Sequence, residues 1–174
     1  SLFISIGTTM EAVAAALIKQ RKNLRIITNN IYVAALASAR SDYTVIITSG
    51  VVRPLDGGVT GVATVDFINQ FKVDYAVLST HGVEGDGSLL DYDYKEVSVM
   101  QAMMANARVR FLGVDHSKFQ SHALVRLGDI TDFDRVFTDR APDGEMQKIL
   151  TAAGVEWLVP EICQHATETA KDEK

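Results

Sequence analysis

The sequence predicts an α/β domain with a mostly parallel sheet and helices on both of its faces. Short, apolar, β-branched runs alternate with amphipathic segments of helical period along the 174 residues. That alternation is typical of parallel strands connected by helices, and the sheet then has both faces covered. With 47% hydrophobic and 22% charged residues, the chain can bury one substantial core. We therefore expect a single domain over residues 1–160.

The first half of the chain supplies four of the expected strands and three of the helices. Strands are expected over residues 2–6, 24–27, 43–48 and 75–78. Helices are expected from the turn after Gly7, over 31–39 and over 63–71. Between the third strand and the third helix lies Arg53-Pro54-Leu55-Asp56-Gly57-Gly58, a segment rich in turn-forming residues.

The second half continues the alternation. The segment 79–87 is too rich in glycine to be regular, and the longest helix is expected over 94–107, with Asp93 as its cap. Strands follow over 109–114, 135–138 and 155–159, with a helix over 143–153 between the last two. The charged tail, residues 161–174, is expected to fray.

The turn Gly7-Thr8-Thr9 joins the first strand to the first helix and allows two interpretations. Gly7 lets the backbone turn tightly, and the first N–H groups of a helix have no partner within it, so the turn can hold a phosphate. Alternatively, Thr8 simply caps the helix, with Glu11 completing a capping box. A glycine-rich dinucleotide fingerprint is absent, so a Rossmann cofactor site is not indicated, and no cofactor is expected.

Polar residues gather where the expected strands end. In open parallel sheets, ligands bind beyond the carboxyl ends of the strands. The candidates for ligand contact at this edge are Gly7, Thr8, Thr9, Thr28, Asn29, Gly50, Arg53, Gly82, Asp91, Glu96 and Lys118. Cations and N–H groups suit a phosphate and carboxylates suit hydroxyl groups, so the set suits a small phosphorylated polyol or sugar.

Some of these candidates have structural alternatives, which the sequence leaves open. Glu96 fits equally well as the capping-box residue of the long helix. Asp91 fits a simple turn, and Arg53 fits a solvated loop.

Composition excludes several classes of function. No apolar run approaches the roughly 20 residues of a membrane span. The single cysteine, Cys163, excludes an internal disulfide, and without a secretory signal a cytoplasmic location is expected. The net charge of −5 and the lack of a basic cluster argue against nucleic-acid binding by this chain alone. His81 and His116 belong to no metal-ligand pattern, so no metal site is expected.

The ordered set of motifs resembles the C-terminal effector-binding domain of DeoR-type bacterial transcriptional repressors. The motifs are Ile6-Gly7-Thr8-Thr9, Ile27-Thr28-Asn29, Ser49-Gly50 with Arg53, Gly82-Val83, Gly87-Ser88-Leu89-Leu90 and Asp115-His116-Ser117-Lys118-Phe119. Each motif is weak alone, but together and in this order they are specific. Further motifs, such as Asp56-Gly57-Gly58 and Asp91-Tyr92-Asp93-Tyr94, resemble the subgroup that regulates glycerol 3-phosphate metabolism.

The resemblance implies a sensor fold like that of ribose-5-phosphate isomerase, NagB and CoA transferases. It also implies an inducer such as glycerol 3-phosphate, which relieves repression of glycerol metabolism genes. A winged helix-turn-helix domain before Ser1 would contact operator DNA, and a homo-oligomer is expected because operators have two-fold symmetry. The start at Ser1, without an initiator Met, is consistent with a fragment of a longer protein.

Two alternatives remain at this point. One is a sugar-phosphate isomerase that uses Glu96 and Lys118, since the implied fold is shared with such enzymes. The other is a nucleotide or coenzyme-binding module, which the missing glycine fingerprint disfavours.

Overall fold

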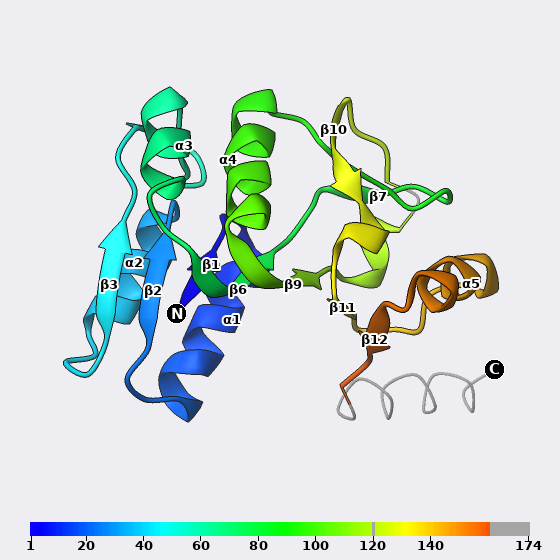
Figure 1. Ribbon diagram of the computed structural model, residues 1–174, viewed down its shortest axis with the longest axis horizontal. Helices are drawn as coiled ribbons and strands as arrows, with labels where there is room; N and C mark the ends of the chain where they lie inside the picture. Colours follow the sequence, from blue (N-terminus) through cyan, green and yellow to red (C-terminus); the bar gives the residue numbers. More distant parts are fainter. Residues whose placement is uncertain (120, 161–174) are drawn as a thin grey trace.

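The computed structural model describes residues 1–119 and 121–160, which fold around a seven-stranded sheet (Figure 1). The strand order is β12-β11-β9-β6-β1-β2-β3, and every neighbouring pair is parallel. The strands are β1 (Leu2–Ile4), β2 (Arg25–Thr28), β3 (Thr44–Ile47), β6 (Val73–Leu78), β9 (Ala107–Gly113), β11 (Arg135–Phe137) and β12 (Glu156–Leu158). The α/β class and the parallel sheet expected from the sequence are confirmed.

Helices cover both faces of the sheet. The helices are α1 (Thr8–Gln20), α2 (Ile31–Ser38), α3 (Val62–Ile68), α4 (Tyr94–Ala105) and α5 (Gly144–Ala153). Successive residues of β1 point to opposite faces. Ile4 therefore packs in the cluster that contains residues of α1 and α2, whereas Phe3 packs in the cluster that contains residues of α3, α4 and α5.

Two small antiparallel sheets were not anticipated. One is a hairpin of β4 (Val51–Val52) and β5 (Val59–Thr60), and the other has the order β10-β8-β7. Its strands are β7 (Gly82–Val83), β8 (Ser88–Asp91) and β10 (Val125–Asp129). The expectation of an irregular segment over 79–87 is wrong at β7. A strand of two residues is too short to give a periodic signal in the sequence.

The first helix begins differently from the capping-box interpretation. Gly7, not Thr8, is the N-cap of α1, and no side chain caps this helix. Gly7 has φ 114°, a conformation that favours glycine. Glu11 instead lies 3.5 Å from the side-chain nitrogen of Asn30. The N-terminal N–H groups of α1 therefore receive no side-chain cap and can donate hydrogen bonds to a bound anion.

The expected cap of α4 is confirmed, but the expectation that α4 is the longest helix is wrong. Asp93 is the N-cap, and its carboxylate accepts a hydrogen bond from the Lys95 amide at 2.8 Å. The helix ends at Ala105, so it has 12 residues and α1, with 13, is longer. The expected frayed tail, 161–174, and Cys163 lie outside the described residues. In the part of the chain that is described, no helix has the length and apolar character needed to cross a membrane.

The cap of α2 gives a direct test of the fold. The buried Asn30 accepts hydrogen bonds from the amides of Tyr32 and Val33 at 2.9 and 3.2 Å. Asn30→Ala leaves both amides without this acceptor, so we expect the free energy of unfolding to fall by about 1–2 kcal/mol in urea denaturation. Ser38→Ala, at the exposed end of the same helix, is the control and should change it by less than about 0.5 kcal/mol. Equal effects in the two variants would contradict the capping role.

Candidate functional site

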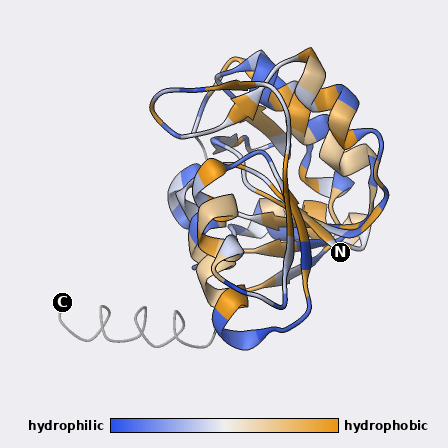
Figure 2. Cartoon of the chain, turned by 90° about the vertical axis from the view of Figure 1, so that its left-hand side faces the viewer, coloured by the Kyte–Doolittle hydropathy of each residue, from blue (hydrophilic) through white to orange (hydrophobic). Residues whose placement is uncertain are grey.

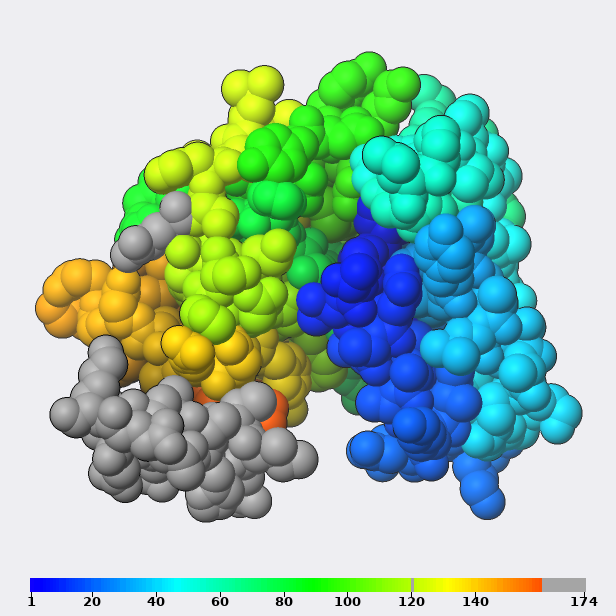
Figure 3. All heavy atoms as spheres, turned by 180° about the vertical axis from the view of Figure 1, so that it is seen from behind, coloured from blue at the N-terminus to red at the C-terminus, as the bar shows by residue number. Residues whose placement is uncertain are grey.

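A cavity of about 300 Å³ opens where β1, β6 and β9 end. Segments that follow these three neighbouring strands form most of its wall, and the remainder comes from the β4–β5 hairpin, the end of β8 and the start of α4. Its lining residues are Ile6, Gly7, Thr8, Thr9, Arg53, Asp56, Ser79, Thr80, His81, Asp91, Tyr92, Asp93, Glu96, Asp115 and Lys118. Figure 3 shows the surface hollowed between the blue start of α1 and the yellow-green segment that follows β9.

One side of the cavity carries two positive groups, Lys118 and the N-terminus of α1, beside the carboxylate of Asp115. Gly7, Thr8 and Thr9 bring the uncapped N-terminus of α1 to the wall, where the helix dipole favours a negative charge. Lys118 lies on the same cavity, and no described carboxylate lies within 4 Å of its ammonium group. The ammonium and the helix N–H groups are thus available to one anion.

Lys118 is held by a short helical turn, η1 (His116–Lys118). Asp115 caps this turn by accepting a hydrogen bond from the Ser117 amide at 2.9 Å. Asp139, which follows β11, accepts a hydrogen bond from the His116 amide, and its Oδ2 lies 2.6 Å from His116 Nδ1. The hydrogen bond from the Ser117 side chain is the main reason that the pKa of Asp115 is lowered, and partial burial opposes this shift. At Asp139 burial favours a higher pKa, but the hydrogen bonds from His116 together outweigh it, so the pKa is lowered. The ends of β9 and β11 therefore fix the backbone that carries Lys118.

The opposite side of the cavity is acidic and is organised by Arg53. Its guanidinium binds Asp56 through Nε at 3.1 Å and through Nη2, and it reaches Asp93 at 2.9 Å and Glu96 at 2.8 Å through Nη1. The hydrogen bond to Asp56 is the main reason that the pKa of Arg53 is raised. Arg53 thus joins the β4–β5 hairpin to the first turn of α4.

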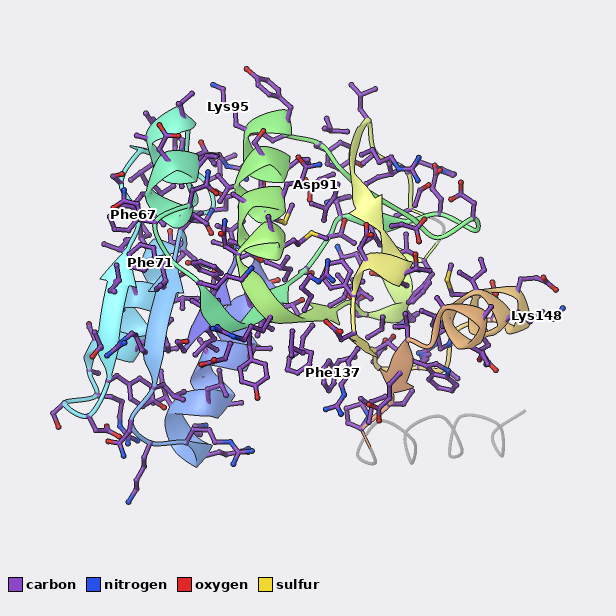
Figure 4. All side chains as sticks on the ribbon, in the orientation of Figure 1. Phe67, Phe71, Asp91, Lys95, Phe137 and Lys148 are labelled. Atoms are coloured by element: carbon purple, nitrogen blue, oxygen red, sulfur yellow. The ribbon has the colours of Figure 1, made fainter. Side chains whose placement is uncertain are left out.

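Glu96 has the most perturbed carboxyl group in the cavity. Its side chain is only 11% exposed, and burial raises its pKa from 4.5 to about 7, with a further contribution from the negative charge of Asp91. The attraction of Arg53 opposes that rise. Asp91 ends β8 and is itself buried, and Figure 4 places it between α4 and β10. A carboxyl with a pKa near 7 can either donate or accept a hydrogen bond at neutral pH.

Seven of the sequence-predicted residues line the cavity together. They are Gly7, Thr8, Thr9, Arg53, Asp91, Glu96 and Lys118. The capping-box alternative for Glu96 is not realised, because its carboxylate is bound by Arg53.

The other four candidates are absent from the cavity wall and have structural contacts instead. The buried Thr28 hydroxyl donates to the Ile4 carbonyl at 2.7 Å, and the Asn29 amide donates to the Val59 carbonyl at 3.1 Å. A Cβ at Gly50 would lie 2.2 Å from the Thr64 hydroxyl, and one at Gly82 would lie 2.2 Å from the Ser121 carbonyl oxygen. These residues allow close packing beside the site.

Several lining residues were not among the candidates predicted from the sequence. Ser79, Thr80 and His81 follow β6, so the strand-end rule that selected the other candidates also applies to them. His81 packs against Tyr92 with ring centroids 4.2 Å apart. Among residues 1–119 and 121–160, no group of three or more His, Cys, Asp or Glu side chains is placed to hold a metal ion.

A family model and the curated relatives point to the same family. The DeoR C terminal sensor domain family matches residues 1–140. The glycerol-3-phosphate regulon repressor of Escherichia coli (strain K12) is 46% identical over 151 residues, which are 87% of this chain and 60% of the repressor. The repressor of the same name from Haemophilus influenzae is 47% identical over 144 residues, 83% of this chain and 56% of the relative. The chain thus spans about three fifths of the length of these relatives.

A more distant relative and one solved structure complete the comparison. The HTH-type transcriptional repressor CsqR of Escherichia coli (strain K12) is 35% identical over 92% of this chain and 61% of the relative. A ribose 5-phosphate isomerase from Plasmodium falciparum has a TM-score of 0.46 and 12% identity, over 69% of this chain and 45% of the enzyme.

The raised pKa of Glu96 predicts a pH-dependent stability. Between pH 4.5 and about 7, the folded chain holds a proton on Glu96 that the unfolded chain has lost, so the free energy of unfolding falls as pH rises through this window. Glu96→Gln removes this dependence. When the pH is raised from 4.5 to about 7, the unfolding free energy of the parent should therefore fall by about 3 kcal/mol more than that of the variant.

Urea denaturation at several pH values measures this difference. Glu145→Gln, at an exposed position on α5, is the matched control and should leave the pH profile of the parent unchanged. Parallel profiles for Glu96→Gln and the parent would contradict the assignment.

Proposed function

Because the chain belongs to the DeoR C-terminal sensor domain family, we propose that its cavity binds a small phosphorylated polyol or sugar, with glycerol 3-phosphate as the favoured inducer. Membership of this family makes the chain a sensor domain of a transcriptional repressor and not an enzyme. The names of the two most similar relatives described above support the choice of inducer.

The observation that carries the proposal is the division of charge across one small cavity. Lys118 and the uncapped N-terminus of α1 lie on one wall, and Asp91 and Glu96 lie on another. A phosphate on the first wall gains charge-assisted hydrogen bonds, each worth about 1.5–3 kcal/mol. Carboxyl groups on the second wall can bind the hydroxyl groups of a polyol. A ligand with a phosphate at one end and hydroxyl groups at the other matches this arrangement.

Arg53 has a different role in this proposal from the one expected from the sequence. Three carboxylates, from Asp56, Asp93 and Glu96, already surround its guanidinium. A phosphate would have to displace them or approach their negative charge. We therefore assign the phosphate to Lys118 and α1, and assign to Arg53 the positioning of the acidic wall.

The size of the cavity also favours a small ligand. About 300 Å³ is at the lower end of the range for small-molecule sites, which run from roughly 300 to 1,000 Å³. Glycerol 3-phosphate has no carbonyl group and hence no acidic α-proton. A carboxylate such as Glu96 therefore has no proton to remove from it, and binding without turnover is the expected outcome.

In the whole repressor, the ligand would act by changing the balance between two conformations. The ligand relieves repression only if its affinity for the DNA-free conformation is higher than its affinity for the DNA-bound conformation. Operator binding itself is assigned to a winged helix-turn-helix domain outside this chain, as in the resemblance described above.

Thermal unfolding with a panel of polyol and sugar phosphates tests the ligand class. At a concentration one hundred times its Kd, glycerol 3-phosphate should add about 2.7 kcal/mol to the unfolding free energy. Lys118→Ala removes the cation opposite the phosphate, so we expect the Kd to rise about tenfold to a hundredfold. Lys148→Ala is the control, because Figure 4 shows Lys148 on α5, a helix that contributes no residue to the cavity wall. The site is misassigned if Lys118→Ala and Lys148→Ala bind alike.

Incubation with ribose 5-phosphate separates a sensor from an isomerase. We expect no ribulose 5-phosphate above the rate without protein, while the same sample still shows a thermal shift with glycerol 3-phosphate. Turnover that disappears in Glu96→Gln would instead assign the cavity to catalysis.

A further inference from the structure

Seven large apolar side chains are exposed around one edge of the main sheet. This β3 edge patch comes from α2, from β3 and the hairpin after it, and from the first residue of α3. Its members are Tyr32, Leu36, Ile47, Val51, Val52, Leu55 and Val62, which are between 41% and 96% exposed. Figure 2 looks onto this edge and shows β3 in the orange of hydrophobic residues, with helices on either side.

Contacts between the contributing elements make the patch continuous. Tyr32 and Leu36 stand one turn apart on α2, which packs against β3. The ring of Tyr32 lies against the hairpin turn, since a Cβ at Gly57 would be 2.8 Å from it. The Ser49 hydroxyl donates to the Ala63 carbonyl at 3.2 Å and so joins the start of α3 to the segment before Val51.

The backbone of β3 is also open at this edge. The amides of Thr44 and Thr48 donate to carbonyls of Leu24 and Thr28, at 2.9 and 3.0 Å. Because alternate residues of a strand point their N–H groups to opposite sides, those of Val45 and Ile47 point away from β2. Within the described residues no strand pairs with that side, since β3 is the last strand of the sheet.

The two edge strands of the main sheet differ in charge. The segment 43–52, Tyr-Thr-Val-Ile-Ile-Thr-Ser-Gly-Val-Val, contains no charged residue. On the opposite edge, β12 carries Glu156, which pairs with Arg135 at 2.5 Å. Edge strands are usually protected by charges, prolines or bulges. β3 has no charge of this kind, which is typical of an edge that is covered in the assembled protein.

We propose that a second copy of this chain covers the β3 edge patch, with β3 pairing antiparallel to its symmetry mate across a two-fold axis. A two-fold interface uses the same surface twice, so an uncharged apolar edge meets an uncharged apolar edge. The seven side chains are between 41% and 96% exposed, so together they can supply much of the roughly 800 Å² that each partner buries in a standard interface. A charged partner would find no opposite charge on these seven side chains.

A second exposed apolar surface is a weaker candidate for this contact. Among the described residues, Tyr75 and Phe137 are 44% and 37% exposed on the main sheet, with Phe111 between them. Only two large side chains are exposed there, and charged residues such as Arg135 and Asp74 are their neighbours. This surface presents less apolar area than the β3 edge patch.

Sedimentation velocity of the chain over a concentration series tests the proposal. We expect a monomer–dimer equilibrium in which Val51→Lys and Leu55→Lys each raise the dissociation constant on the order of 100-fold, because each places a charge in an apolar contact. Leu124→Lys is the matched control, because Leu124 is 88% exposed but lies outside the patch, next to β10, and should leave the constant unchanged. All three positions are exposed, so the variants should fold.

Hydrogen exchange gives a second measurement that does not depend on substitution. The amides of Val45 and Ile47 should exchange slowly at concentrations where the dimer forms and faster on dilution. A chain that stays monomeric at every concentration overturns the proposal. So does a dimer that both patch variants leave intact, or one that only Leu124→Lys disrupts.

Discussion

The parallel alignment of β1, β6 and β9 is the constraint on which the candidate site depends. Three neighbouring strands end at the same edge, so the segments after them meet around one cavity. The uncapped start of α1 follows β1, and the turn that carries Lys118 follows β9. Neither feature would concentrate positive potential alone, because one helix terminus carries only about half a charge. Their convergence places two positive groups on one wall, beside Asp115, in a chain whose net charge is −5.

The acidic wall is organised by a single guanidinium. Asp56, Asp93 and Glu96 come from the hairpin and from α4, and their negative charges would repel one another without Arg53. Grouping charges with little solvent is costly unless each has a partner. One arginine can satisfy several carboxylates because its donors form a planar fork. The raised pKa of Glu96 shows that this compensation is incomplete, since burial and Asp91 outweigh the attraction of Arg53.

The sequence was sufficient for the class of the fold and for most of the site, because both depend on local patterns. Apolar runs identified every strand of the main sheet, and the residues after them included Thr8 and Lys118 of the cavity wall. Asp91 and Glu96 were proposed as carboxylates near these strand ends, and both line the cavity. Strand order is not a local property, and it determines which strand ends lie beside the cavity. Thr28 ends β2, and Gly50 follows β3 at the edge of the sheet, whereas the overlooked His81 follows β6, directly beside β1. The contact of Arg53 with α4 depends on a hairpin whose strands are too short to be recognised in the sequence.

The β4–β5 hairpin is the element that the cavity and the β3 edge patch share. Val51 and Val52 form β4 and belong to the patch, while Arg53, the next residue, points its guanidinium to the acidic wall. A ligand that binds Glu96 or Asp91 must compete with, or add to, the contacts of Arg53. Arg53 is joined directly to Val52, the last residue of β4, by one peptide bond. A ligand and a second copy that prefer different positions of this hairpin would each change the affinity for the other, because coupling between sites is reciprocal.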